Sequence, residues 1–336
     1  MLTRTFGKNF EVSDWTEELV LIPPTWGRLA ADGLFQEEGV EQYTVQFEQT
    51  TRDGAILVDM VRGERATANK EQGSLIRSWA IPSYPYDDYI TPSDIKGKRA
   101  YGSASDEEQL ALVRARRLAR IRQNHAWTLE YARWKALTSG DVYAPNGTVS
   151  MNYFTEFGVS QKSVNFVFGT STTDIIAKIE EGIAHIQDNS SGQNIAGIVC
   201  YCSSGFFSSL ISHANVKTAY TYYTSTQEPL RQRVGGNTTM YREFFHGGVL
   251  FVEVRGNYAG NAFIPANEAV MVPVGTDAFK TFFAPANKFD LLGTVGEQAY
   301  VFEYPGERGD KIILESESNF LNALARPALV VKCTTA

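Results

Sequence analysis

The sequence predicts an α+β fold, and three patterns support that class. Apolar and polar residues alternate from Tyr43 to Phe47, which is the period of a half-buried strand. From Asp106 to Ser139, apolar residues recur at helical steps. Between about 170 and 285, strand and helix patterns follow one another. The chain therefore combines a hairpin, one long helix and a mixed subdomain.

The composition limits the classes to which the chain can belong. Its 336 residues, 43% of them hydrophobic, suffice for one large domain or two of ordinary size. The opening residues contain no apolar signal segment, and no window reaches the roughly 18 consecutive apolar residues of a membrane span. With 31 basic and 38 acidic residues the formal charge is −7, which repels polyanions and argues against a nucleic-acid reader. We expect a globular protein without a membrane partner.

The cysteines predict a core rather than a metal site. Cys200, Cys202 and Cys333 are too few for a disulfide framework and lack the spacing of a zinc site. Residues two apart in a strand point to the same face, so Cys200 and Cys202 are expected to be buried together. This pattern indicates a reducing compartment.

The first hundred residues predict an arm followed by a projecting hairpin. Up to about Glu41 we expect an extended arm with one short helix. The strand at 43–47 is followed by a turn at Asp53-Gly54, a second strand at 55–61, a polar stretch at 62–74 and a returning strand at 75–81. A two-stranded ribbon alone is marginally stable in water, so a partner subunit is expected to support it.

The helix pattern from Asp106 to Ser139 opens with Ser105 and Glu108 in a capping-box arrangement and closes at Gly140. At about 1.5 Å per residue it would be roughly 50 Å long. Its apolar stripe rotates between the first half and the second, so different neighbours should contact each half. The arginines of the first half are expected to form carboxylate pairs on a solvated face rather than to bind DNA.

The rest of the chain alternates between the two kinds of element. We predict a hairpin at 141–158, a helix at 173–187, a buried strand around 198–199, a short helix at 206–213, an apolar strand at 249–254 and a last strand at 328–332.

The sequence carries no signature of catalysis. The common glycine-rich, nucleophile-turn and zinc-helix motifs are absent, and the four histidines are scattered. Ser203-Ser204-Gly205 lacks the glycine that a nucleophile turn needs two residues before its serine. Asp87-Asp88 and the pair Glu315 and Glu317 are interpreted as surface strand residues. We expect no enzyme, no cofactor and no metal.

The C-terminal part resembles a known family. It reads AFIPANEAVMVPVGT at 262–276, FKTFFAPAN at 279–287 and EYPGERGDKIILESESNFLNALARPALVVK at 303–332. This resembles the lambda-type major capsid protein E family of tailed bacteriophages, with Phe263-Ile264-Pro265, Tyr304-Pro305 and Arg326-Pro327-Ala328-Leu329 at the corresponding places. The N-terminal half matches by the order of its elements, so the resemblance spans nearly the whole chain.

The resemblance implies the Hong Kong 97 type phage capsid fold. Its parts would be an N-terminal arm (1–35), an extended loop in the form of a β-hairpin (36–100), a spine helix and peripheral domain (101–170 and 286–336) and an axial domain (171–285). The chain does not begin with the long helical scaffolding segment that some members carry, so a separate scaffold protein is expected.

The resemblance also implies a function and partners. The chain would be the major capsid protein of a tailed bacteriophage, assembled in the host cytoplasm into pentamers and hexamers of an icosahedral virion shell. Scaffold, portal and decoration proteins are the expected partners, and packaged double-stranded DNA would be contacted only non-specifically. The alternatives are an encapsulin-like nanocompartment shell protein and an uncharacterised α/β enzyme or binding protein.

The candidate contacts between subunits lie on the hairpin tip and the helix. Some members of the wider fold cross-link this loop through Lys and Asn, but lambda-type shells generally rely on non-covalent contacts. The candidates are Arg62, Gly63, Glu64, Arg65, Asn69, Lys70, Glu71, Arg114, Arg116, Arg117 and Arg120.

Overall fold

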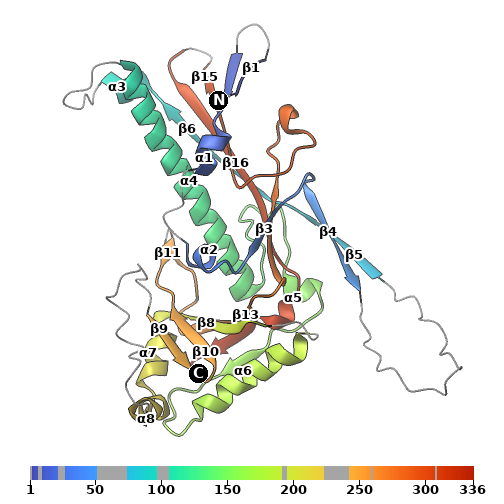
Figure 1. The fold of residues 1–336 in the computed structure, drawn as a ribbon, viewed down its shortest axis with the longest axis vertical. Helices are drawn as coiled ribbons and strands as arrows, with labels where there is room; N and C mark the ends of the chain where they lie inside the picture. Colours follow the sequence, from blue (N-terminus) through green and yellow to red (C-terminus); the bar gives the residue numbers. More distant parts are fainter. Residues whose placement is uncertain are drawn as a thin grey trace, which may run out of the picture.

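The molecule is elongated, with a seven-stranded sheet towards one end and a six-stranded sheet at the other (Figure 1). A computed structural model describes residues 2–6, 10–21, 27–50, 74–96, 106–190, 195–222, 242–258, 260–306 and 309–336. The long helix α4 lies along the larger sheet and reaches the smaller one, and the β4–β5 hairpin projects to the side.

The seven-stranded sheet is built around β16, whose two edges pair with different strands. Along one edge, β15 pairs with residues 312–317 of β16 and β14 with residues 319–324, while β6 pairs with residues 312–319 along the other edge. Parallel pairing with β14 places β3 at one end of the sheet. Its strands are β1 (Leu2–Phe6), β2 (Phe10–Asp14), β3 (Gln36–Gly39), β6 (Ser83–Ile90), β14 (Phe279–Ala284), β15 (Tyr300–Pro305) and β16 (Ile312–Leu324).

Helix α4 spans Asp106–Ser139, as predicted, and its two halves meet different neighbours. In the first half, Leu118 and Ile121 belong to a small core with Ile90 and Leu314 of the larger sheet. In the second half, Tyr131 and Trp134 join the main core. Gly140 ends the helix at φ 72°, where a side chain would collide with Phe154. The predicted rotation of the apolar stripe is confirmed.

The six-stranded sheet has the order β7-β17-β13-β8-β10-β9 and is buried on both faces. On one face Met271 packs against Gly182 of α6, and on the other Tyr201 contacts Trp134 of α4. Its strands are β7 (Ser163–Asn165), β8 (Gly197–Cys202), β9 (Glu243–His246), β10 (Val249–Glu253), β13 (Glu268–Val274) and β17 (Val331–Thr334). Its helices are α6 (Ile175–Asn189), α7 (Ser204–Ser212) and α8 (Ala214–Tyr222).

The remaining elements are short, apart from the projecting hairpin. They are α1 (Thr16–Leu21), α2 (Arg28–Asp32), β4 (Thr44–Thr50), β5 (Ser74–Ala80), α3 (Pro92–Lys96), α5 (Tyr153–Glu156), β11 (Asn257–Tyr258), β12 (Asn261–Ala262) and the 3-10 helices η2 (Phe289–Leu291) and η3 (Pro327–Leu329).

The cysteines lie where the sequence places them. All three are buried free thiols, and the sulfurs of Cys200 and Cys202 on β8 are 3.8 Å apart. Burial raises the pKa of the Cys202 thiol, so it stays protonated and behaves as a small apolar group.

Three local predictions were wrong. The arm contains the β1–β2 hairpin and two helices rather than one short helix. Residues 141–158 form no ladder: Asp141 and Asn152 make a single bridge, because the Asn152 side chain instead caps α5 by accepting from the Thr155 N–H. The last strand begins at Val331, since Pro327 starts a 3-10 turn.

Candidate assembly surfaces and the polar core of the spine helix

The β4–β5 hairpin is fixed to the body of the subunit by aromatic rings at its base. Phe47 of β4 and Trp79 of β5 are 4.4 Å apart between ring centroids. Phe47 meets Phe282 edge-on at 5.5 Å, and Trp79 meets Tyr153 at 5.4 Å. Such edge-to-face pairs stabilise a particular orientation as well as burying area. The direction in which the hairpin leaves the body is therefore defined.

Further out, the hairpin presents apolar side chains to solvent. Leu75 is 54% and Ile76 is 65% exposed, and they are neighbours on β5. Adjacent strand residues point to opposite faces, so both faces of the ribbon carry an exposed aliphatic group. Figure 1 shows this part of the hairpin projecting away from the rest of the molecule. Exposure of this kind is typical of a surface that another molecule covers.

The candidate contacts on the hairpin tip fall outside the described residues. Arg62, Gly63, Glu64, Arg65, Asn69, Lys70 and Glu71 all belong to the segment 51–73, as do the predicted turn and the strand at 55–61. A role for them in assembly stays a prediction.

The arginines in the first half of α4 divide into two groups. Arg114 makes a bidentate pair with Glu303 of β15, at 2.7 and 2.6 Å, and its guanidinium lies 4.8 Å from the Trp15 ring centroid. Arg117 lies 3.4 Å from Asp88. The predicted carboxylate pairs are therefore confirmed for these two. Arg116 and Arg120 are exposed, and a contact role between subunits stays a prediction for all four.

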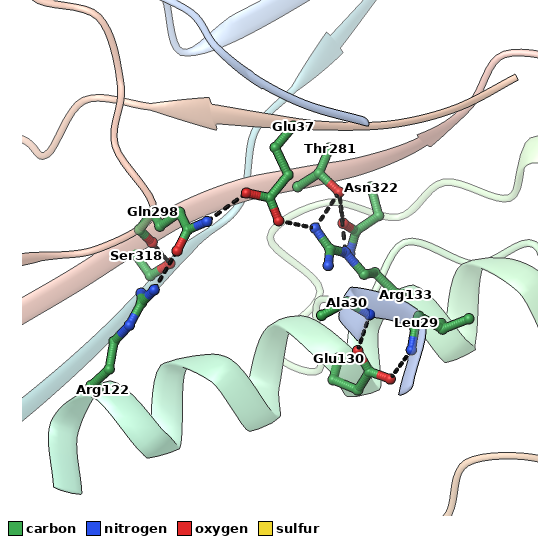
Figure 2. Close-up of polar contacts among 10 residues, drawn as sticks. All are labelled: Leu29, Ala30, Glu37, Arg122, Glu130, Arg133, Thr281, Gln298, Ser318 and Asn322. Atoms are coloured by element: carbon green, nitrogen blue, oxygen red, sulfur yellow. Dashed lines mark hydrogen bonds and ion pairs between the residues drawn. The ribbon is translucent and has the colours of Figure 1, made fainter. Parts of the chain in front are cut away.

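In its second half, α4 is joined to the larger sheet by buried polar groups (Figure 2). Arg133, 1% exposed, donates to the hydroxyl of Thr281 on β14 at 3.0 Å and to the carboxylate of Glu37 on β3 at 2.8 Å. The Thr281 hydroxyl in turn donates to the side-chain carbonyl of Asn322 on β16 at 2.9 Å. One guanidinium thus ties the helix to β3 and β14, and Thr281 extends the connection to β16.

On the same stretch of α4, Glu130 caps helix α2. Its carboxylate accepts from the backbone N–H groups of Leu29 at 2.8 Å and Ala30 at 3.3 Å, and from the Trp134 indole at 3.1 Å. Burial raises the pKa of Glu130, while these hydrogen bonds and Arg133 act in the opposite direction. The N–H groups at a helix start need such a partner, so a side chain 101 residues away supplies the cap of α2.

A second branch of the network runs through Gln298. Its side chain accepts from Arg122 and donates to Glu37, while its backbone carbonyl accepts from Ser318 of β16 at 2.6 Å (Figure 2). Burial lowers the pKa of Arg122, partly offset by Glu37. Glu37 therefore receives hydrogen bonds from both branches. Because β3 ends at Gly39 and β4 begins at Thr44, the network also holds the segment that leads into the hairpin.

His125 is a buried titratable group near the middle of α4. Its Nε2 lies 2.9 Å from the hydroxyl of Ser316 on β16, and that hydroxyl donates to the carbonyl of Tyr86 on β6. Burial, and then the nearby charge of Arg122, lower its pKa to about 4. The imidazole is therefore neutral at pH 7 and serves as a structural hydrogen-bonding group.

Sequence reasoning missed this network, although one signal was present. Glu130 stands three residues after Trp127 and four before Trp134, which are part of the apolar stripe. Positions three and four apart share a helix face, so Glu130 belongs to the buried face rather than to a solvated one. The partners Glu37, Thr281 and Gln298 come from distant segments and leave no local pattern.

The residues considered for chemistry have structural partners instead. Ser203 accepts from the Phe206 N–H and caps α7, and Asp88 pairs with Arg117. Glu315 lies 2.7 Å from Lys288, while Glu317 accepts from a neighbouring serine and asparagine. Among the described residues, no cluster of His, Cys, Asp and Glu could hold a metal ion. Within that same part of the chain, no helix is long and apolar enough to span a bilayer.

Comparison with known proteins identifies the family. The family model described as phage major capsid protein E matches residues 11–335. The chain belongs to that family. A relative from Pseudomonas phage KPP10, named major capsid protein, is 43% identical over 96% of both chains. The major capsid protein of Salmonella phage Felix O1 is 28% identical over 98% of both.

Solved structures show that the fold is the Hong Kong 97 type. The capsid protein of a prophage from E. coli CFT073 superposes with a TM-score of 0.60 at 10% identity, covering 93% of this chain and 94% of that one. The mature capsid of bacteriophage PhiM1 gives 0.52 at 11% identity, covering 90% and 85%. Members of the major capsid protein E family are shell proteins. The chain is accordingly a structural protein and not an enzyme, and many copies of it build the virion shell.

Proposed function

We propose that copies of this chain form the pentamers and hexamers of a closed icosahedral head around double-stranded DNA, with each β4–β5 hairpin lying across a neighbouring subunit. The observation that supports this most is the hairpin itself: its base is held by Trp79 and Phe47, while Leu75 and Ile76 further out are exposed. A neighbour that covers them removes apolar surface from water, and many modest contacts of this kind stabilise a closed shell.

The two sheets correspond to the two parts of the proposed subunit. We assign the six-stranded sheet to the axial domain around the five-fold and six-fold centres and the seven-stranded sheet to the peripheral domain. Pairing supports moving three strands across the predicted division between these two domains. Strand β14 (279–284) belongs with the peripheral sheet, whereas β7 (163–165) and β17 (331–334) belong with the axial sheet.

The proposed partners act at different stages of assembly. A scaffold protein sets the curvature, a portal occupies one vertex, and a decoration protein covers the finished surface in the virion after assembly in the host cytoplasm. Packaged DNA meets a chain with a formal charge of −7, so its contacts are weak and non-specific. Arg116 and Arg120, exposed on α4, are the helix residues best placed for contacts between subunits.

Deleting residues Glu64 to Gly73 tests the role of the hairpin. The deleted subunit should fold, with a wild-type circular dichroism spectrum and melting temperature, but should fail to sediment as shells. A second variant keeps the length of the loop but has the same ten positions replaced by glycine and serine. It tests the identity of the residues separately from the length of the loop, and it should also fail to sediment as shells. Normal particles from the deletion would refute the proposal.

A further inference from the structure

The loop between β14 and β15 presents a compact apolar tip. Phe289 is 86%, Leu292 69% and Val295 57% exposed, within seven consecutive residues. Single exposed apolar residues are common on protein surfaces, but three of them within one short loop form an apolar patch. We call these three residues the apolar tip.

The loop that carries the apolar tip is internally ordered. The Thr294 hydroxyl donates to the Leu291 carbonyl at 2.7 Å, and the Gly296 N–H donates to the Val40 carbonyl at 3.0 Å. Gly296 packs so closely on the Phe283 carbonyl that a side chain there would collide with it. The tip is therefore held outward by its own backbone, which reduces the entropy lost when a partner covers it.

An uncharged groove lies at the other side of the larger sheet. It has a volume of about 350 Å³ and lies between β6, α4 and the loop at 143–148. Its apolar walls are three half-buried tyrosines and three prolines, and its lining includes no Asp, Glu, Lys or Arg. The walls are Pro82, Tyr84, Pro85, Tyr86, Tyr143 and Pro145.

Three contacts of Tyr84 keep the groove in shape. The rings of Tyr84 and Tyr143 are parallel, within 5°, at 6.2 Å between centroids, and the Tyr84 hydroxyl donates to the Tyr143 carbonyl. Tyr84 also stacks on Phe320 of β16 at 4.4 Å. Preformed pockets lined by aromatic residues are the usual receptors for the few side chains that dominate an interface.

The topology places the tip and the groove on opposite edges of one sheet. Strands β14 and β15, which the loop connects, follow one another along one edge of β16, while β6 pairs along the other edge. The loop is also hydrogen-bonded to Val40, the residue that follows β3. The tip of one copy is therefore directed away from its own groove, and the two surfaces of adjacent copies can meet head to tail.

We propose that the apolar tip of one subunit inserts into the tyrosine–proline groove of the next copy of this chain. This rests on the proposed assembly into rings and shells, in which another copy is the neighbour on every side. The three residues of the apolar tip and the lining of the groove are uncharged, and the exposed carboxylate of Asp290, next to Phe289, stays in water at the rim, so the contact desolvates no ion. A contact between two different surfaces is heterologous and links successive copies into a ring when the rotation closes.

Two substitutions test the contact from its two sides. Phe289→Ser removes the centre of the tip, and Thr148→Trp fills the groove from its exposed rim. Each should raise the protein concentration needed for half-maximal assembly about tenfold or more, because burying one large apolar side chain suffices for such a change. Leu21→Ser, at an equally exposed leucine, and Ser150→Trp, just beyond the groove, are the matched controls and should assemble as wild type.

Cross-linking identifies the occupant of the groove. In particles of the double variant Leu292→Cys and Thr148→Cys, a short bis-maleimide should give a ladder of dimers, trimers and larger species on a denaturing gel, since the native cysteines are buried. Each single-cysteine variant should remain monomeric. Four outcomes would overturn the inference while leaving the proposed shell function intact. These are dimers alone, no cross-link, a cross-link to a different protein, and assembly of Phe289→Ser at the wild-type concentration. If the wild-type chain forms no particles, the shell proposal fails and this inference falls with it.

Discussion

The two sheets of this capsid protein bury different kinds of side chain beneath the helices that cover them. In the six-stranded sheet, β13 buries Val270, Met271 and Val272, and α7 adds Phe206 and Phe207, with the carboxylate of Glu253 on β10 as an exception that pairs with arginine. In the seven-stranded sheet, the contact with α4 buries arginine, glutamate, histidine, serine, threonine and asparagine. The buried polar residues there are Arg122, His125, Glu130, Arg133, Thr281, Ser316, Ser318 and Asn322.

The two kinds of core contribute differently to stability and to geometry. An apolar core stabilises by the area it buries and tolerates side chains of similar size, because the hydrophobic effect has no direction. A buried polar network adds little net stability, but each donor must face its acceptor. We infer that the network around Arg133 fixes the position of α4 on the larger sheet.

The largest expected effect is in the apolar core. Phe206 is fully buried, 5.2 Å from Phe166 between ring centroids. Phe206→Ala should lower the free energy of unfolding by about 3–5 kcal/mol, through lost burial and the cavity left behind. Phe206→Leu, which keeps most of the apolar volume, should cost only about 1–2 kcal/mol. Urea unfolding of the unassembled subunit measures both, and equal losses would mean that this core is as shape-specific as the polar one.

The next largest effect tests the polar network by a change that keeps the charge. Arg133→Lys should lower the free energy of unfolding by about 3 kcal/mol, because lysine lacks the Nε–H that donates to Thr281 and its shorter side chain stops short of Nη2, the atom that donates to both Thr281 and Glu37. The matched control Arg116→Lys, at an exposed site on the same helix, should be neutral within about 0.5 kcal/mol. A neutral Arg133→Lys would show that only the charge matters, and the contrast between the two sheets would then disappear.

Sequence patterns predicted the elements whose signals are local. Helix α4 was placed at its observed bounds, since its periodicity, capping box and terminal glycine agree. The strand at 75–81 and the helices at 173–187 and 206–213 were placed within two residues of β5, α6 and α7. Strand β8 was recognised by its short apolar run.

Elements that depend on distant partners were not predictable in this way. Strand β16 buries Ser316 and Ser318 on the face where a strand pattern would require apolar residues, so its alternation is hidden. Strand β6 contains Pro85 and two aspartates, which argue against a strand unless the sheet is known. Helix α2 has only five residues, too few for a stable isolated helix, and it depends on the cap from Glu130.

The smallest of the three effects is a dependence on pH that belongs to the larger sheet. His125 has a pKa of about 4 in the folded subunit, against about 6.5 in an unfolded chain, because burial and Arg122 disfavour its charged form. Between these values the unfolded chain binds more protons than the folded one, so the free energy of unfolding falls as the pH falls. From pH 7 to pH 5 this single group should contribute a loss of about 2 kcal/mol.

Carboxylates also titrate in this range, so the comparison of interest is between wild type and His125→Gln. Glutamine can still donate to the Ser316 hydroxyl but does not titrate, and the groups around it, Arg122 on α4 and Tyr86 on β6, are the same in both proteins. The variant should therefore show a shallower loss of stability between those two values in urea unfolding, by about 2 kcal/mol. Because His246 at the edge of the smaller sheet is only partly buried, His246→Gln should change the slope much less. Equal slopes for wild type and His125→Gln would mean that the imidazole is hydrated when it is protonated. The contact between α4 and β16 would then open more easily than the buried side chains of Ser316, Ser318 and Asn322 indicate.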